Sequence, residues 1–181
     1  MRIDIPERTK ILVLTGPECS GKTTCAERLS KKYDLPRVSE YARYYLTENG
    51  PEYALDDLQN ITMQQLKNEK EASSSHPLII CDTDIVTLEI WSLEVFGRSL
   101  HITDERAGSK LYLLSYPDIP WEPDPLRENP NDRLRLFDRY EEYLISNDLP
   151  YVILKENDRQ SLELRSNRIP QQKNNVIYSG K

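Results

Sequence analysis

The sequence predicts an α/β domain in which a five-stranded parallel sheet carries helices on both faces. Short apolar runs alternate along the chain with longer segments of helical character. Residues 16–23 read Gly-Pro-Glu-Cys-Ser-Gly-Lys-Thr and match the phosphate-binding pattern G-x-x-x-x-G-K-[ST] between the first strand and the first helix. The 181 residues suit one domain with its own core. Together these observations predict a small P-loop NTPase domain of the kinase-like type.

The first half of the chain supplies three of the five strands. In chain order the expected elements are strand 10–15, helix 21–33, strand 36–39, helix 40–46, helix 54–72, strand 77–81 and helix 84–96. The second helix should end near Asn49-Gly50-Pro51, because glycine and proline terminate helices. The run Pro77-Leu-Ile-Ile-Cys81 is apolar throughout, as expected of a strand that is buried on both faces.

The second half of the chain completes the sheet. Its expected elements are strand 110–115, helix 130–146, strand 151–154 and a last helix at 158–168. Residues 116–130, rich in Pro, Asp and Arg, are expected to form a loop, and about 122–135 of this region a lid. We therefore expect a single domain over 1–169, followed by a polar and flexible tail at 170–181.

Composition narrows the function classes. The net charge of −6 argues against a general nucleic-acid or membrane-surface binder, although a P-loop attracts phosphate locally. No apolar run approaches the roughly 18 residues of a membrane span, and the N-terminus lacks the apolar stretch of a signal peptide. The three cysteines form no metal-ligand pattern and are expected to be reduced thiols. We expect a cytoplasmic protein that binds a small molecule.

The glycine loop predicts a site for ATP and Mg²⁺. Gly16 and Gly21 permit backbone angles and close approaches that a Cβ would obstruct. Backbone N–H groups of the loop and of the following helix then point at an anion. Lys22 should reach the β- and γ-phosphates, and the Thr23 hydroxyl should coordinate Mg²⁺. The expected ATP-binding residues are Gly16, Pro17, Glu18, Cys19, Ser20, Gly21, Lys22, Thr23 and Thr24.

Acidic residues follow two other expected strands. Ligands of parallel sheets bind beyond the carboxyl ends of the strands, so the segments after four strands should share one cleft. Asp82 ends an apolar strand and is expected to hold Mg²⁺ or accept a proton. Glu40 either accepts a proton from a substrate hydroxyl or interacts with the dipole of its helix. Asp84 either binds substrate or caps the helix that begins there.

The loop after the fourth strand contributes basic and aromatic residues. Arg127 and Arg133 are expected to close over ATP as part of the lid, and the alternative is a solvated charged face. Trp121 is either a hydrophobic plug beneath the loop or a stacking surface for a flat ligand. Trp91, within a helix, is expected in the core.

Four segments together resemble the nicotinamide riboside kinase domain of the NadR family, over about residues 9–155. They are the glycine loop, Ser39-Glu-Tyr-Ala-Arg43, Cys81-Asp-Thr-Asp84 with Ile90-Trp91 and Val95-Phe-Gly97, and Asp118-Ile-Pro-Trp-Glu-Pro-Asp124 with Leu126-Arg127. The resemblance implies ATP-dependent phosphorylation of nicotinamide riboside to nicotinamide mononucleotide. It implies that Trp121 stacks on the nicotinamide and that the segment around Arg127 and Arg133 is the lid. From the segments that follow the strands, we also expect Glu40, Arg43, Asp84 and Asp118 to bind substrate.

The chain departs from the family at several points. Bifunctional members carry a nucleotidyltransferase domain before the kinase, whereas nine residues precede the first expected strand, so adenylyl transfer is not expected to carry over. Cys19 stands where the family often has Ser. The last strand is followed by Lys155-Glu-Asn-Asp158 rather than a glycine-containing turn near the adenine. Two other functions stay open: a kinase of another nucleoside or small alcohol, and a regulatory protein that binds ATP without phosphorylating a small molecule.

Overall fold

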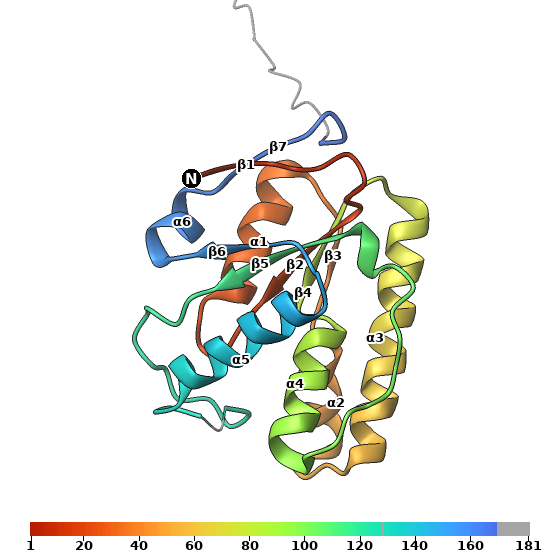
Figure 1. Ribbon diagram of the computed structural model, residues 1–181, viewed down its shortest axis with the longest axis vertical. Helices are drawn as coiled ribbons and strands as arrows, with labels where there is room; N and C mark the ends of the chain where they lie inside the picture. The colour runs from red at the N-terminus through yellow and green to blue at the C-terminus, as the bar shows by residue number, and fades with distance from the viewer. Residues whose placement is uncertain (128, 170–181) are drawn as a thin grey trace, which may run out of the picture.

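Five parallel strands form the central sheet of the protein (Figure 1). The computed structural model describes residues 1–127 and 129–169. The strand order is β3-β4-β2-β5-β6, and every neighbouring pair is parallel. The strands are β2 (Ile11–Thr15), β3 (Arg37–Val38), β4 (Ile79–Asp82), β5 (Lys110–Ser115) and β6 (Tyr151–Leu154). The predicted fold class is therefore confirmed.

The central position of β2 follows from its sequence. All five of its residues are buried, as an apolar strand covered on both faces requires. Leu12 and Leu14 pack on one side against α1 (Lys22–Tyr33). Ile11 and Val13 point to the other face, which is covered by α4 (Ile85–Phe96) and α5 (Arg133–Ser146). The carboxyl end of β2 is thus enclosed on three sides by the elements that make up the site.

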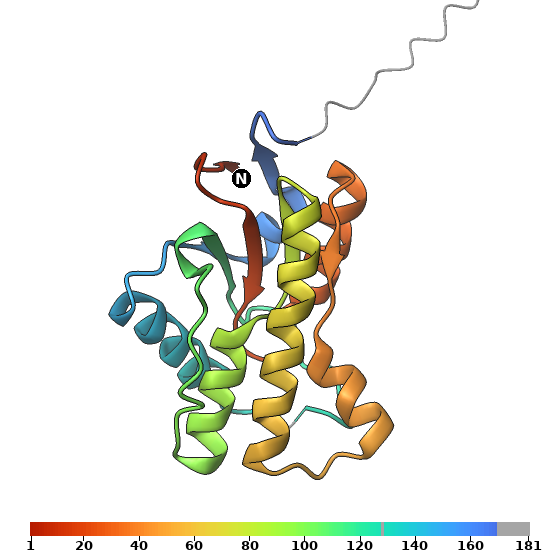
Figure 2. The same ribbon diagram turned by 90° about the vertical axis from the view of Figure 1, so that its right-hand side faces the viewer.

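Two further helices extend the domain beside α4. They are α2 (Tyr41–Asn49) and the long α3 (Leu55–Ser75); α3 lies next to α4 (Figure 1), and in Figure 2 it stands between α2 and α4. Ala42, Leu58, Ile61 and Leu88 form a small third core between these helices. This core holds α2 and α4 as the two side walls of the cavity described below. No helix of the described residues is long and apolar enough to cross a membrane.

The end of the described chain differs from the sequence prediction. The helix expected at 158–168 is wrong: a short α6 (Glu156–Ser161) is followed by strand β7 (Glu163–Arg165). β7 pairs in parallel with β1 (Arg2–Asp4), an edge pair that the sequence did not predict. In each strand only the central residue, Ile3 or Leu164, is buried. Three residues are too short for a period-2 pattern to be recognised. The predicted tail at 170–181 lies outside the described residues.

Candidate active site

The glycine loop connects β2 to α1 and has the backbone geometry that its two glycines were expected to provide. Gly16 has φ +126°, and a Cβ there would lie 2.7 Å from the Ser115 carbonyl oxygen of β5. Gly21 has φ +77° and is the N-cap of α1, where it has no side chain with which to cap the helix. The first N–H groups of α1 are therefore open to an anion from outside the chain.

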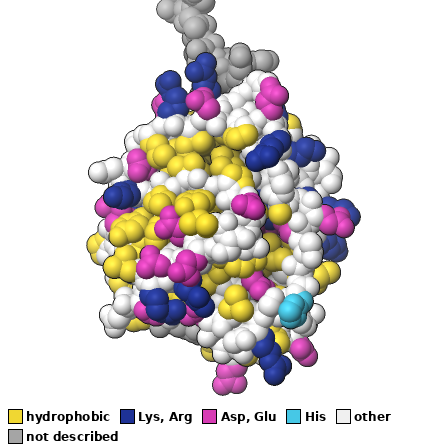
Figure 3. Space-filling view, in the orientation of Figure 1, with side chains coloured by type: hydrophobic (Ala, Val, Ile, Leu, Met, Phe, Trp, Pro, Cys, Tyr) yellow, Lys and Arg dark blue, Asp and Glu magenta, His cyan; other side chains and the backbone are white. Residues whose placement is uncertain are grey.

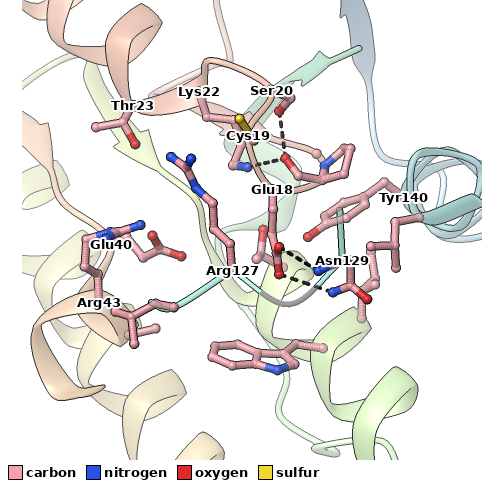
Figure 4. A pocket seen from close by; sticks show the side chains of 18 of the residues that line it. Glu18, Cys19, Ser20, Lys22, Thr23, Glu40, Arg43, Arg127, Asn129 and Tyr140 are labelled. Atoms are coloured by element: carbon pink, nitrogen blue, oxygen red, sulfur yellow. Dashed lines mark hydrogen bonds between the residues drawn. The ribbon is translucent and has the colours of Figure 1, made fainter. Parts of the chain in front are cut away.

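The Lys22 side chain folds back along the loop. Its Nζ donates to the carbonyl oxygen of Pro17 at 2.7 Å, and the Ser20 hydroxyl donates to the same oxygen at 2.7 Å (Figure 4). Burial lowers the pKa of Lys22, while the carboxylates of Glu40 and Asp82 oppose this shift. Three carboxylates, Glu18 included, thus partly offset the effect of burial on the pKa of Lys22.

A cavity of about 460 Å³ opens in front of the glycine loop. All nine predicted ATP-binding residues, from Gly16 to Thr24, line it. Four of the residues predicted to act in catalysis or to bind substrate also line the cavity: Lys22, Glu40, Arg43 and Arg127. Segments that are distant in sequence therefore meet there, as the strand-end rule predicted. The remaining predicted residues, Asp82, Asp84, Asp118, Trp121 and Arg133, lie outside the cavity wall.

Glu40 lines the cavity (Figure 4), and its carboxylate acts electrostatically on Lys22. It is the N-cap residue of α2, but its carboxylate makes no capping hydrogen bond, so the side chain is available to the cavity. Burial raises the pKa of Glu40, and the nearby cations Lys22 and Arg43 work in the opposite direction. A carboxylate with a raised pKa inside a cavity has the properties of a general base.

Asp82 lies at the end of β4, next to the glycine loop, and is 2% exposed. Its Oδ1 is buried and has no hydrogen-bond partner among the described residues, and its Oδ2 lies 3.6 Å from the Arg37 guanidinium. Burial raises the pKa of Asp82, and the nearby Thr23 hydroxyl and Lys22 ammonium lower it again. An unpaired carboxylate oxygen beside a hydroxyl is a donor set that suits a hard cation such as Mg²⁺.

Asp84 is placed by the structure as a helix cap rather than in the cavity wall. Its Oδ1 accepts from the Val86 N–H at 3.0 Å, and the residue is fully buried. Its Oδ2 accepts from Lys110 Nζ at 2.8 Å and from the Tyr112 hydroxyl at 2.9 Å. Contact with substrate, one of the two expectations for Asp84, does not fit this position. The capping alternative describes it instead.

The predicted lid is held against the glycine loop by several polar contacts. The Glu18 carboxylate accepts from both the backbone N–H and the side-chain amide of Asn129, each at 3.2 Å (Figure 4). The Arg133 guanidinium donates to the carbonyl oxygens of Cys19, at 2.9 Å, and Ile119, at 3.0 Å. Arg133 therefore fastens the lid to the loop from outside the cavity.

Arg127 is the lid arginine that enters the cavity (Figure 4). It donates to the carbonyl oxygen of Glu122 and lies close enough to Lys22 to lower the pKa of that ammonium. Arg43 of α2, which also lines the cavity, pairs with Asp124 of the lid at 3.1 Å. The pKa of Asp124 is lowered by the Leu126 backbone N–H and by Arg43. Two arginines, Arg127 and Arg43, thus line the cavity.

The positions of the two tryptophans match the sequence prediction only in part: Trp91 packs against the third core, as expected, but also lines the cavity, whereas Trp121 does not line it. Trp121 lies within the lid, between the guanidinium groups of Arg127 and Arg133 at 6.0 and 5.8 Å from its ring. Trp91, expected in the core, is half-buried and lines the cavity from α4. Its indole N–H donates to the Tyr53 hydroxyl at 2.7 Å, and the two rings meet edge-on at 4.8 Å. The indole is therefore fixed in orientation.

Asp118 is also displaced from its expected role. It pairs with the Arg159 guanidinium and accepts from the Glu156 N–H at 2.8 Å, at the start of α6. Arg159 is 5% exposed and also donates to the carbonyl oxygens of Tyr116 and Leu154 at 3.0 and 2.7 Å. Its Nε would lie 3.2 Å from a Cβ at Gly21. The Asp118–Arg159 pair thus packs against the glycine loop at Gly21.

Sequence reasoning missed three residues of this region: Trp91, Asn129 and Arg159. Trp91 was assigned to the core because an aromatic residue within an apolar helix is more often core than ligand contact. One turn of a buried helix carries no sign of which residue faces a cavity. Asn129 and Arg159 both contact the glycine loop. Asn129 lies 111 residues from its partner Glu18 along the chain, so no local pattern could identify these contacts.

Lys and Arg side chains are interspersed with Asp and Glu over the face shown in Figure 3. Two arginines of α5 share one carboxylate there: Arg135 lies 2.6 Å from Glu94, and Arg139 lies 3.1 Å from the same side chain. The basic side chains in this part of the molecule therefore act on groups at the cavity and its rim.

The chain matches the model of the AAA domain family over residues 11–161. A search of the curated proteins found no match. Among solved structures, NadR protein in complex with NAD and AMP-PNP is similar, with 20% identity and a TM-score of 0.60 over 82% of this chain and 45% of that chain. NadR in complex with NR gives 19% identity and a TM-score of 0.59 over 82% and 46%. Deoxyadenosine kinase from M. mycoides gives 14% and 0.51 over 80% and 89%.

This chain spans somewhat under half the length of the NadR chains that it matches. At these identities, the likeness to solved structures shows the fold. The family model covers most of the sequence, including the glycine loop and the segments that meet it at the cavity. This chain therefore belongs to the AAA domain family and has the fold of the P-loop kinases.

Proposed function

We propose that this protein is an ATP-dependent kinase that phosphorylates the 5′-hydroxyl of nicotinamide riboside to give nicotinamide mononucleotide. The observation that carries the proposal is a single cavity with a complete phosphate-binding loop at one end and an oriented indole, that of Trp91, in its wall. Glu40 and Arg43 line the same cavity. The fold shared with NadR structures solved with AMP-PNP and with NR supports both the donor and the acceptor.

The loop would hold the triphosphate through its N–H groups and the uncapped start of α1. Lys22 would leave the Pro17 carbonyl oxygen, which it now contacts at 2.7 Å, and turn to the β- and γ-phosphates. Arg127, already in the cavity, would neutralise charge on the transferring group. Arg133 would keep the lid in place through its bonds to Cys19 and Ile119.

Thr23 and Asp82 are the residues that would hold Mg²⁺. The fit rests on the unpartnered, buried Oδ1 of Asp82 and on the hydroxyl beside it. Magnesium sites in kinases use one or two protein oxygens and complete their shell with phosphate and water. Held by these two residues, the ion would offset the negative charge that develops on the phosphate oxygens during transfer.

Glu40 is the better candidate for the general base, because it lines the cavity and Asp82 does not. A base must lie within hydrogen-bond reach of the proton that it accepts. Glu40 would take the proton of the riboside hydroxyl as that oxygen attacks the γ-phosphorus, while the bond from this phosphorus to the β–γ bridging oxygen breaks and ADP leaves. Arg43, the cation on the same helix, would hold the ribose or the entering phosphate.

Trp91 takes over the stacking role that the sequence prediction gave to Trp121. Nicotinamide riboside carries a flat, positively charged pyridinium ring. An indole face attracts such a ring through dispersion and its negative quadrupole, by roughly 0.5–2 kcal/mol. Because Tyr53 fixes the indole through a hydrogen bond and an edge contact, stacking would cost little ordering.

The proposal is tested with purified protein, ATP, Mg²⁺ and a panel of ribosides, with a control that lacks the acceptor. Mass spectrometry should detect nicotinamide mononucleotide, and coupled ADP release should require the riboside. Turnover of another nucleoside with no mononucleotide formed would replace the substrate and keep the kinase, a candidate supported by the fold shared with deoxyadenosine kinase. Nucleotide binding with no acceptor-dependent ADP release would favour the regulatory alternative.

A further inference from the structure

A fully buried lysine lies at the start of β5, behind the site. Lys110 Nζ is 2.8 Å from Glu69 of α3, 2.8 Å from Asp84 and 2.6 Å from Asp104. None of these four side chains is more than 5% exposed. Burying an ammonium is unfavourable unless it is paired, and here three carboxylates from three segments converge on it. The network therefore fixes where Asp84 lies relative to the sheet.

Asp84 is separated from Asp82 by one strained residue. Thr83 has φ +67°, a left-handed conformation that is rare for a β-branched residue, and it is 3% exposed. Such strain persists only where the surroundings over-determine the backbone. On one side the Thr83 N–H donates to the Leu14 carbonyl oxygen at 2.9 Å. On the other side is Asp84, so its contacts decide whether the turn keeps this shape.

We propose that Lys110 and Tyr112 are positioning residues for phosphoryl transfer, because they hold Asp84 and thereby the strained turn that places the Asp82 carboxylate beside Thr23. The proposal rests on the proposed kinase function. Both donors come from β5, the strand next to β2, and both bind the same oxygen, Asp84 Oδ2, at 2.8 and 2.9 Å. The other oxygen, Oδ1, caps α4. Each carboxylate oxygen of Asp84 therefore has a separate task.

Tyr112→Phe tests this device with the smallest change. It removes the hydroxyl bound to Asp84 and leaves the ring and the ion cluster in place. Tyr151→Phe is the matched control: Tyr151 is the registered partner of Tyr112 on β6, and its hydroxyl also bonds a carboxylate, that of Glu141, at 2.8 Å. Glu141 belongs to α5 and lies outside the cavity wall. The control thus removes the same kind of bond away from the Asp82 turn.

Two readouts are measured for the wild type and both variants. The first is steady-state kinetics, which gives kcat and the KM values for ATP and for nicotinamide riboside. The second is the rise in melting temperature caused by ATP with EDTA and by ATP with MgCl₂. For Tyr112→Phe we expect kcat to fall about tenfold with both KM values nearly unchanged, since small misplacement of a reacting group costs up to about 10²-fold. Tyr112→Phe should keep the rise in melting temperature caused by ATP with EDTA. It should lose most of the additional rise caused by MgCl₂. Tyr151→Phe should resemble the wild type.

Wild-type kcat and a full magnesium-dependent rise in Tyr112→Phe would overturn the proposal. So would a loss of all ligand effects in step with a lower unliganded melting temperature, because that marks a purely structural role. If Tyr112→Phe does not fold, Asp84→Asn replaces it, since Asn still caps a helix but no longer offers a carboxylate to Lys110. If the wild type phosphorylates no riboside, the proposed function fails, while the magnesium-dependent melting still decides the positioning role.

Discussion

Replacing Trp91 with alanine is the change that most directly tests the acceptor side of the site. Its indole is half-buried in the cavity wall, hydrogen-bonded to Tyr53 at 2.7 Å and in edge contact with that ring at 4.8 Å. Truncation of a fully buried Trp costs about 3–5 kcal/mol. Half-burial reduces this to about 2 kcal/mol, which corresponds to a melting temperature lower by about 4–8 °C in a domain of this size.

The effect on binding is separate from the effect on stability. Loss of roughly 0.5–2 kcal/mol of stacking raises KM for nicotinamide riboside by about 2–30-fold. KM for ATP should change little, because the triphosphate would be held at the other end of the cavity by Lys22 and its loop. Trp91→Phe keeps a ring and should recover part of the riboside affinity. Both KM values are measured at 25 °C, well below the melting temperature, with calorimetry on the unliganded protein.

Trp121→Ala provides the comparison. Trp121 packs between Arg127 and Arg133 in the lid, so its loss should lower kcat and disturb both substrates together. An unchanged riboside KM in Trp91→Ala, with a selective rise in Trp121→Ala, would refute the assignment of Trp91. That result would restore the stacking role that the sequence alone gave to Trp121.

Three other changes test the remaining parts of the site. Lys22→Ala should lower kcat/KM by about 10²-fold or more with little change in unliganded melting, because its hydrogen bond lies within the loop; normal steady-state turnover would reject the loop assignment. Glu40→Gln should bind both substrates yet turn over slowly, and should lose the acid limb of the pH–rate profile. Burial raises the pKa of Glu40, so wild-type activity should fall as pH drops through that raised pKa, and a fully active variant would transfer the base role to Asp82. Burial also raises the pKa of Glu69 from 4.5 to about 7. The protonated carboxyl therefore contributes fully to the free energy of unfolding below the unfolded pKa, and this contribution is lost as pH rises towards 7. Melting curves of Glu69→Gln should therefore improve relative to the wild type between about pH 5 and 8, and a constant difference would contradict the shift.

The sequence was sufficient for the sheet and for the phosphate end of the site, because their signals are local. The run Ile11–Thr15 is apolar throughout and is buried throughout. The glycine loop fixes its own backbone over eight residues, and all of them line the cavity. Parallel strands then bring their carboxyl ends to one edge, so Glu40 and Arg43 could be placed in the same cleft before any coordinates.

Roles that depend on side-chain direction could not be settled in this way. Asp82 ends β4, Asp84 follows two residues later, and the sequence predicts both as candidate ligands. The strained Thr83 separates Asp82, whose Oδ1 has no partner among the described residues, from Asp84, a helix cap bound to Lys110. Asp118 has a carboxylate that could contact substrate. It pairs instead with Arg159, which lies 41 residues later in the chain. Partners at such separations are chosen by packing and not by spacing along the chain.

The sequence by itself thus determined that this protein has a parallel sheet, a phosphate-binding loop and acids at neighbouring strand ends, since periodicity and motif spacing encode these features within a few residues. Only the tertiary structure decided which tryptophan lines the cavity and which arginine enters it. Trp91 and Trp121 are equally aromatic, and Arg127 and Arg133 are equally charged; what separates them is the packing of α4 and of the lid against the loop. That packing arises from contacts between segments far apart in the chain, which no local pattern of residues records.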